Sequence, residues 1–187
     1  KTPMLKTGTF GLRTAVAAVA TAAVIACTGT TQAADDLEVV EILLPIPAFM
    51  GTPTDIPLNE HIEKPSEKPR PPFMAPKGTI CVSIDKPVTG SDKNPINGDY
   101  ELVTDDNKEA GDSNVLELHR KLQWVQIDLE DPAKIYAVVV WHAHDTPQVV
   151  HDVIVQLADD ADFTENVRTI YNNDYDNSAG LGVGKEK

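Results

Sequence analysis

The chain has 187 residues, and its 29 acidic and 16 basic residues give a formal net charge of −13. This charge disfavours nucleic acid and anionic membrane surfaces as partners, because no basic patch is available to offset phosphate charge. Hydrophobic residues make up 41% of the chain, which excludes a wholly disordered protein. The two cysteines are too few for a disulfide framework.

Residues 1–33 have the pattern of a secretory signal peptide. Lys6 and Arg13 supply a positive region, and residues 15–27 form an apolar stretch too short to span a bilayer comfortably. Small residues then precede Ala34, as a signal peptidase requires. The pattern predicts an exported protein that is periplasmic, on the cell surface or secreted.

Cys27 offers a second way for the signal to end. Residues 24–27 resemble a bacterial lipobox, which would keep Cys27 as a lipidated first residue and tether the protein to a membrane. If cleavage instead follows Ala33, the mature chain keeps only Cys81 and forms no internal disulfide. Both alternatives predict export.

Residues 34–78 contain nine of the fourteen prolines of the chain. Proline fixes φ and removes a ladder donor, so this region favours neither a long helix nor a central strand. Residues 37–44 are expected to form one short strand or a helical turn. Residues 64–76 are expected to be extended and polyproline-like. The region is interpreted as an arm or linker that serves as a spacer, with a recognition motif as the alternative.

From residue 79 onward, short strand-like runs alternate with turns. The most informative stretch, residues 122–142, contains two such runs joined by a turn at residues 130–132. The first has one apolar face, and the second, residues 135–141, is apolar on both. This pattern predicts an antiparallel β-sandwich or barrel. Further strands are expected at residues 79–84, 100–103, 115–118, 149–157 and 167–171.

These runs resemble the discoidin domain, the type C domain of coagulation factors five and eight. The resemblance implies a mostly β domain over residues 79–187, an antiparallel β-sandwich of the galactose-binding-like jelly-roll type. Residues 141–144 and 172–178 look like an exported bacterial subfamily. The segments that carry the resemblance are residues 86–89 (KPVT), 102–105 (LVTD), 123–129 (QWVQIDL) and 152–160 (DVIVQLADD).

Two departures from the family pattern affect the expected chemistry. The acidic turn that holds a structural calcium in many relatives reads Asp105-Asp106-Asn107, without the usual central glycine. Asp105 and Asp106 are therefore candidate calcium ligands, with a solvated acidic turn as the alternative. The chain also stops before the closing strand of the family, so an open sheet edge is expected.

The other candidate residues belong to loops at the rim of the sandwich. Sugar hydroxyls require polar partners, and a pyranose face requires an aromatic platform. For the last of these loops, which contains Asp174 and Asp176, the alternative to a sugar site is a flexible, glycine-rich loop. A zinc site at two histidines, completed by His151 or Asp145, is a further alternative. The candidate ligand-binding residues are His142, His144, Tyr171, Asn173, Asp174, Tyr175, Asp176 and Asn177.

No nucleophile elbow or Ser-His-Asp order is evident, so the chain is not expected to be an enzyme. The leading prediction is an exported, non-catalytic module that binds a carbohydrate or a cell-surface polymer. It rests on resemblance at the level of the fold. One alternative is a structural or adhesion protein that uses the proline-rich arm or the open sheet edge. Another is an accessory module of a secreted hydrolase.

Overall fold

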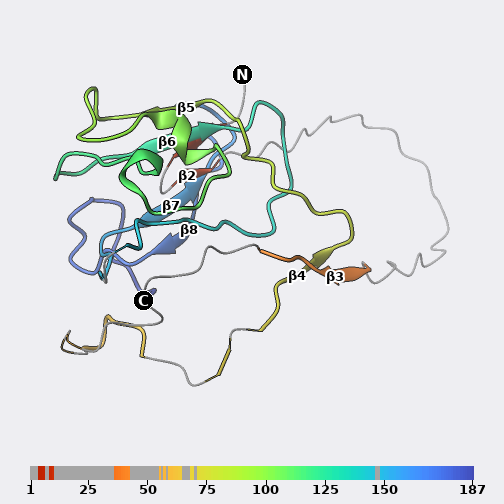
Figure 1. Cartoon of the computed structure of the whole chain (residues 1–187), viewed down its shortest axis with the longest axis horizontal. Helices are drawn as coiled ribbons and strands as arrows, with labels where there is room; N and C mark the ends of the chain where they lie inside the picture. The colour runs from red at the N-terminus through yellow and green to blue at the C-terminus, as the bar shows by residue number, and fades with distance from the viewer. Residues whose placement is uncertain are drawn as a thin grey trace, which may run out of the picture.

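The structure is a computed structural model, and its described residues form a β-rich fold (Figure 1). It describes residues 4–6, 9–10, 36–42, 55, 57, 59–64, 68–69, 71–145 and 148–187. The elements are β1 (Met4–Lys6), β2 (Thr9–Phe10), β3 (Leu37–Val39), β4 (Met74–Pro76), β5 (Val88–Gly90), β6 (Val125–Asp128), β7 (Ile154–Leu157), β8 (Arg168–Asn172), and the 3-10 helices η1 (Tyr100–Val103) and η2 (Asp112–Asn114).

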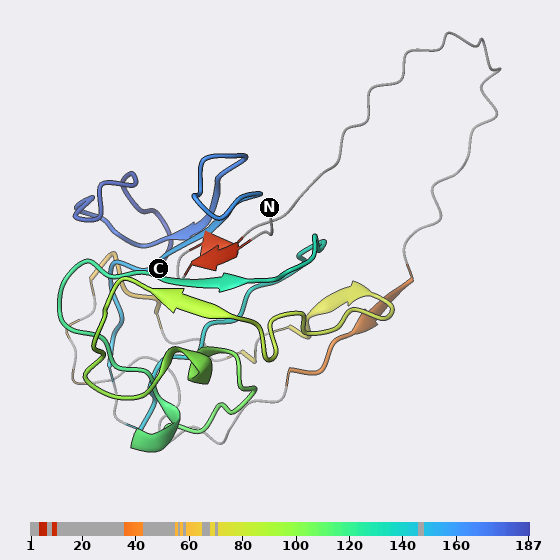
Figure 2. The same cartoon turned by 90° about the horizontal axis from the view of Figure 1, so that it is seen from above.

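Six of these strands form one sheet in the order β5-β6-β1-β2-β7-β8. The pairs β5–β6 and β7–β8 are antiparallel, and the β7–β8 ladder is irregular between Val155 and Gln156. β1 is antiparallel to its neighbours, whereas β2 runs parallel to β7. Figure 2 shows β1 beside β6, with β5 on the other side of β6.

The predicted signal peptide is described only in part. Residues 4–6 and 9–10 pair within the sheet, whereas the apolar residues 15–27, the expected cleavage site and Cys27 lie outside the described residues. Among the residues that the structure describes, no helix has both the length and the apolarity needed to cross a membrane.

Part of the proline-rich arm folds as a second, two-stranded sheet. β3 pairs antiparallel with β4, and Ala75 of β4 is buried. The Glu38 side chain accepts a hydrogen bond from the Gly78 N–H at 2.8 Å and so holds the chain after β4. The expected short strand at residues 37–44 is present as β3, but the expectation of a polyproline-like segment is wrong for residues 74–76. A proline at the end of a short edge strand is compatible with such pairing.

The apolar core lies on β6 and β7. Ile127, Leu129 and Leu157 form a buried cluster, and β6 is covered on both faces because Gln126 is buried as well. The Gln126 Nε2 donates a hydrogen bond to the Ala161 carbonyl oxygen at 3.1 Å. The partly buried side chains packed against the cluster are Val82, Val88, Ala133 and Ile135.

The second run of the central stretch does not form the expected strand. Residues 132–145 follow an irregular path without strand pairing, and Val139, Val140 and Trp141 are exposed. Ala133 and Ile135 nevertheless pack against the core cluster. The apolar alternation therefore identified residues that reach the core, but within the described part of the chain no strand forms a ladder with them.

The other predicted strands have mixed outcomes. β7 and β8 confirm the strands expected within residues 149–157 and 167–171, with shorter or shifted bounds. Residues 100–103 form η1 instead of a strand, with the Thr104 N–H bonded to the Glu101 carbonyl oxygen. Residues 79–84 contain no strand, and residues 115–118 contribute a single bridge from Glu117 to Asn97.

Candidate functional site

The candidate site is the loop that follows β8, here called the Asp174 loop and defined as residues 173–184. The Asp174 side chain is fully buried. Its carboxylate accepts hydrogen bonds from the Ala179 N–H at 2.8 Å, the Ser178 N–H at 2.9 Å and the Ser178 hydroxyl at 3.1 Å. These bonds, led by that from Ala179, hold the pKa of Asp174 below its usual range. Asp174 is therefore an anionic anchor for the loop.

Asparagine side chains attach the Asp174 loop to the sheet. The Asn173 Oδ1 accepts a hydrogen bond from the Val153 N–H at 2.7 Å, and the Asn173 Nδ2 donates to the Val150 carbonyl oxygen at 3.1 Å. The Asn172 Nδ2 donates to the Gly182 carbonyl oxygen at 2.9 Å. Asn173, a predicted ligand contact, thus holds two neighbouring backbone segments in place.

The loop closes on β8 at a glycine. The Gly184 N–H donates to the Asp174 carbonyl oxygen at 2.7 Å. A Cβ atom at Gly184 would lie only 2.5 Å from the Asp174 backbone nitrogen, so a larger residue would displace the backbone. The glycines of this segment therefore do more than lend flexibility, because Gly184 permits a close backbone approach.

The two predicted aromatic platforms are already engaged. The Tyr175 ring packs on the His61 ring with their centroids 3.8 Å apart, and its hydroxyl donates to the His61 carbonyl oxygen at 3.1 Å and also to that of Glu186. The Tyr171 hydroxyl donates to the Lys187 carbonyl oxygen at 3.2 Å. Desolvation raises the pKa of both phenols. Tyr175 thus connects the loop to His61 in the proline-rich arm.

Three carboxylates meet at the base of the loop. Oxygen atoms of Asp152, Asp174 and Asp176 lie within 4.8 Å of one another, and Asp152 and Asp176 are exposed. Carboxylate oxygens are the ligands that calcium prefers, although calcium takes six to eight oxygens in all. Asp174 and Asp176 were predicted as site residues, but Asp152 was not. It lies 22 residues before Asp174, and only the pairing of β7 with β8 brings the two together.

The predicted calcium turn lies elsewhere, directly after η1. Asp106 adopts a φ of 61°, the left-handed conformation expected of the glycine it replaces. Its carboxylate forms an ion pair with Lys108. The Asp105 Oδ1 accepts a hydrogen bond from the Asn107 N–H at 2.9 Å. A cationic side chain thus already neutralises one of the two expected ligands.

The predicted histidines lie on the irregular segment 132–145. The His144 Nε2 forms a hydrogen bond with the Lys108 carbonyl oxygen at 3.0 Å. Desolvation lowers the pKa of His142. Across the described part of the chain, the three-carboxylate group is the one set of three potential metal ligands with this spacing. The structure therefore does not group His142 and His144 with His151 or Asp145.

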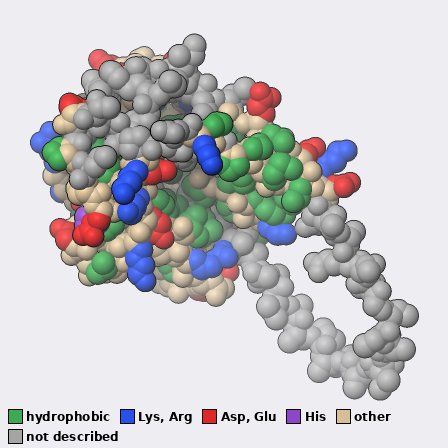
Figure 3. All heavy atoms as spheres, turned by 90° about the horizontal axis from the view of Figure 1, so that it is seen from below, with side chains coloured by type: hydrophobic (Ala, Val, Ile, Leu, Met, Phe, Trp, Pro, Cys, Tyr) green, Lys and Arg blue, Asp and Glu red, His purple; other side chains and the backbone are tan. Residues whose placement is uncertain are grey.

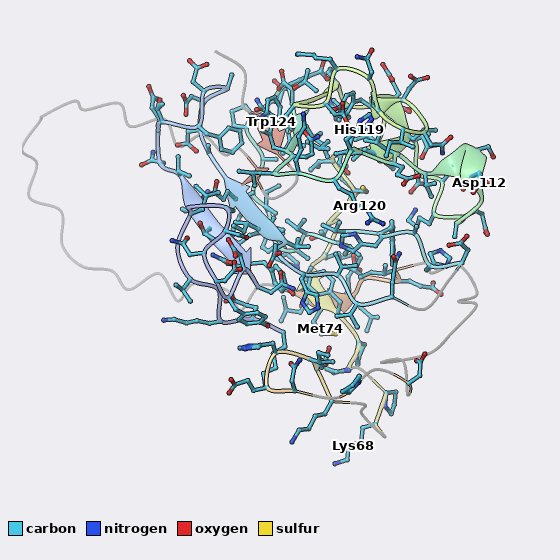
Figure 4. The ribbon with its side chains drawn as sticks, turned by 90° about the vertical axis from the view of Figure 1, so that its left-hand side faces the viewer. Lys68, Met74, Asp112, His119, Arg120 and Trp124 are labelled. Carbon is cyan, nitrogen blue, oxygen red and sulfur yellow. The ribbon has the colours of Figure 1, made fainter. Side chains whose placement is uncertain are left out.

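A second polar anchor joins Asp92, which follows β5, to His119. Buried Asp92 accepts hydrogen bonds from the His119 backbone N–H at 2.8 Å and bonds the His119 Nδ1 at 2.9 Å. These bonds, led by that from the backbone N–H, lower the pKa of Asp92 to about 2. Figure 4 shows His119 and Trp124 near the top of the view, Met74 below them and Lys68 at the bottom.

An apolar surface covers the β3–β4 pair. Leu37, Val39 and Met74 are 56%, 57% and 45% exposed. Figure 3 shows hydrophobic side chains gathered on this side of the molecule. Next to β4 lies an open groove of about 280 Å³, lined by Pro76, Lys77, Gly78, Thr79, Ile80, Val82, Ala133, Lys134 and Tyr136.

The polar anchors, the three carboxylates and the apolar surface of the β3–β4 pair are properties of the chain itself. No family model, curated protein or solved structure matches this chain.

Proposed function

We propose that this chain is an exported, non-catalytic binding module with a discoidin-like β-sandwich, and that it binds a carbohydrate or a cell-surface polymer through the Asp174 loop. The observation that carries the proposal is the buried Asp174 anchor. It fixes the loop backbone while Asp176 and Asn177 are exposed. A loop that is ordered before binding loses less conformational entropy when a ligand docks.

The chemistry of the loop favours a neutral, hydroxyl-rich ligand. Exposed Asp152 and Asp176 add negative charge to a chain that already carries a net charge of −13, so polyanions are repelled. Carboxylates accept charge-assisted hydrogen bonds from hydroxyl groups, and these are stronger than neutral ones. Asn173 and Asp174 serve as positioning residues in this proposal, and Asp176 and Asn177 are the contact residues.

Binding of purified chain to a panel of neutral and acidic polysaccharides tests the proposal. The variant Asp176→Ala/Asn177→Ala is compared with Asp131→Ala, an exposed carboxylate outside the loop. We expect the double variant to bind the best ligand about tenfold more weakly, equivalent to about 1.4 kcal/mol, and the control to bind normally. Thermal melting of each variant checks that the domain stays folded. Unchanged binding by the double variant would remove the loop from the proposal.

Calcium is the structural ion that the resemblance implies, and two places offer carboxylates for it. Thermal melting with millimolar calcium, compared with a chelator, measures its effect, because a ligand that binds only the folded state raises the melting temperature. If calcium raises the melting temperature of the wild-type chain but not that of Asp105→Asn, the ion is assigned to the turn after η1. If calcium raises the melting temperature of the wild-type chain but not that of Asp152→Asn, the ion is assigned to the three carboxylates. No rise in the wild-type chain would remove calcium from the proposal.

An adhesion role is the second candidate, and the apolar surface of the β3–β4 pair favours it. Three large apolar side chains on a small two-stranded sheet form a patch of the kind that protein partners cover. The variant Leu37→Ser/Val39→Ser should reduce attachment of chain-coated beads to cells if this surface is the adhesive one. Attachment that persists in this variant but falls in Asp176→Ala/Asn177→Ala would favour ligand binding by the loop.

A further inference from the structure

Two buried strands of the large sheet, β6 and β7, are not paired with each other. β6 pairs with β5 on one side, and β7 pairs with β8 on one side. Within the part of the chain that the structure describes, no residue of β6 pairs directly with a residue of β7. The position between them is taken by β1 and β2, which fall within the predicted signal peptide.

The register shows how β1 fits between β6 and β7. Leu5 lies opposite Ile127 of β6 on one side and opposite Leu157 of β7 on the other. Ile127 and Leu157 both belong to the buried core cluster. Neighbouring strands are about 4.8 Å apart, so at this level the gap admits a single strand. Without such a strand, the facing backbone groups of two core strands would lack hydrogen-bond partners.

We propose that the gap between β6 and β7 is a strand-binding site and that its occupant is β1 and β2 of this chain, residues 4–6 and 9–10. Three consecutive residues of β1 are in register with three of β6, and both residues of β2 are in register with β7. The site adds a strand to two existing strand edges, so its ligand class is an extended peptide segment.

This binding gives β1 and β2 a second role. Lys6, which lies opposite Gln126 in the sheet, is also one of the basic residues of the predicted signal peptide. A segment that is paired on both sides is not available to the export machinery at the same time. Folding and export therefore compete for it, a consequence that rests on the export proposed above.

Disulfide trapping in the purified full chain tests the site. Cys27 and Cys81 are first replaced by serine, and the pair Met4→Cys/Asp128→Cys is introduced, because Met4 and Asp128 are register partners. Opposed residues of an antiparallel pair have Cα atoms about 4.5–5.5 Å apart, within disulfide reach. The control is Met4→Cys/Val125→Cys, displaced by three residues, or about 10 Å, along β6.

The first pair should cross-link within one chain, about tenfold faster or more than the control. Equal rates for the two pairs would overturn the site. Cross-linked dimers in place of cross-linked monomers would also overturn it, because the occupant would then come from a second chain.

The rate at which the predicted signal peptide is cleaved in exporting cells tests the competition between folding and export. Leu5→Pro deletes a backbone donor from β1 but keeps both basic residues, so it should be processed about twofold faster or more than the wild type and the control Leu5→Val. Equal processing of all three would overturn the competition. Failure of all three to be processed would contradict export itself, whereas the disulfide result alone decides the strand site.

Discussion

A polar loop is usually less ordered than an apolar segment, but the Asp174 loop and the irregular segment 132–145 differ in the opposite way. The loop is rich in polar residues, yet a buried carboxylate and two asparagine side chains hold its backbone. The segment 132–145 contains the longest apolar run after residue 33, yet it forms no strand, and Val139 and Val140 are exposed. Hydrogen-bond partners, more than hydrophobicity, therefore decide which of these two regions has a fixed backbone.

The largest effect is expected from removing the anchor of the loop. Asp174→Ala removes the buried acceptor of the Ala179 N–H, while the Ser178 N–H keeps the Asp176 Oδ1 as an acceptor, so we expect the melting temperature to fall by about 5 °C or more. The matched control is Asp131→Ala, which removes an exposed carboxylate outside the loop and should have little effect. Differential scanning calorimetry measures both. Equal melting temperatures for the two variants would contradict the anchor role.

A smaller effect is expected where the irregular segment reaches the core. Ile135 packs against the buried cluster, so Ile135→Ala should lower the free energy of unfolding by about 1–2 kcal/mol, less than for a fully buried isoleucine. Val140 is exposed, and Val140→Ala should change the free energy by less than about 0.5 kcal/mol. Urea unfolding compares the two, and the reverse order would show that residues 138–141 form the core contact instead.

Acid should weaken the polar anchors and leave the apolar contacts unchanged. The folded pKa of Asp92 is about 2, below its ordinary value of 3.8, and that of Asp174 is also lowered. Their stabilising contributions are fully present well above pH 3.8 and are lost as the pH falls toward 2. Melting temperatures between pH 6 and 2 should fall less steeply for Asp92→Asn than for the wild type. Parallel curves would remove Asp92 from the acid response.

The smallest expected effect is that of the His119 ring on the second anchor. The Asp92 carboxylate keeps its bond to the His119 backbone N–H when the ring is removed. His119→Ala should therefore lower the melting temperature by only about 1–3 °C at pH 6, because the ring is largely exposed. A loss as large as that of Asp174→Ala would show that the ring, and not the backbone N–H, holds Asp92.

The residue pattern predicted β6, β7 and β8 because their β-branched runs lie where strand partners exist. The same pattern over-predicted residues 135–141, because apolar alternation reports burial and not the presence of a partner strand. The prediction for residues 135–141 was wrong about strand pairing, but Ile135 does pack against the core cluster.

The sequence predicted only part of the candidate site, because a pattern along the chain does not reveal which segments come together. Asp174 and Asp176 stand out as an alternating acidic run, but nothing local distinguishes the buried carboxylate from the exposed one. Asp152 joins them through strand pairing, which spacing along the chain does not reveal. The engagement of Tyr175 by His61, 114 residues earlier, is equally invisible in a local pattern.

Amide hydrogen exchange tests the central claim most directly, because it compares the two regions in a single experiment. If the Asp174 loop is fixed before any ligand binds, the amides of Ser178 and Ala179 will exchange slowly in the free chain, and those of residues 138–141 will exchange fast. Asp174→Ala should remove the protection of Ala179, whereas the Ser178 amide keeps the Asp176 carboxylate as an acceptor. Fast exchange at both amides in the wild-type chain would contradict the account.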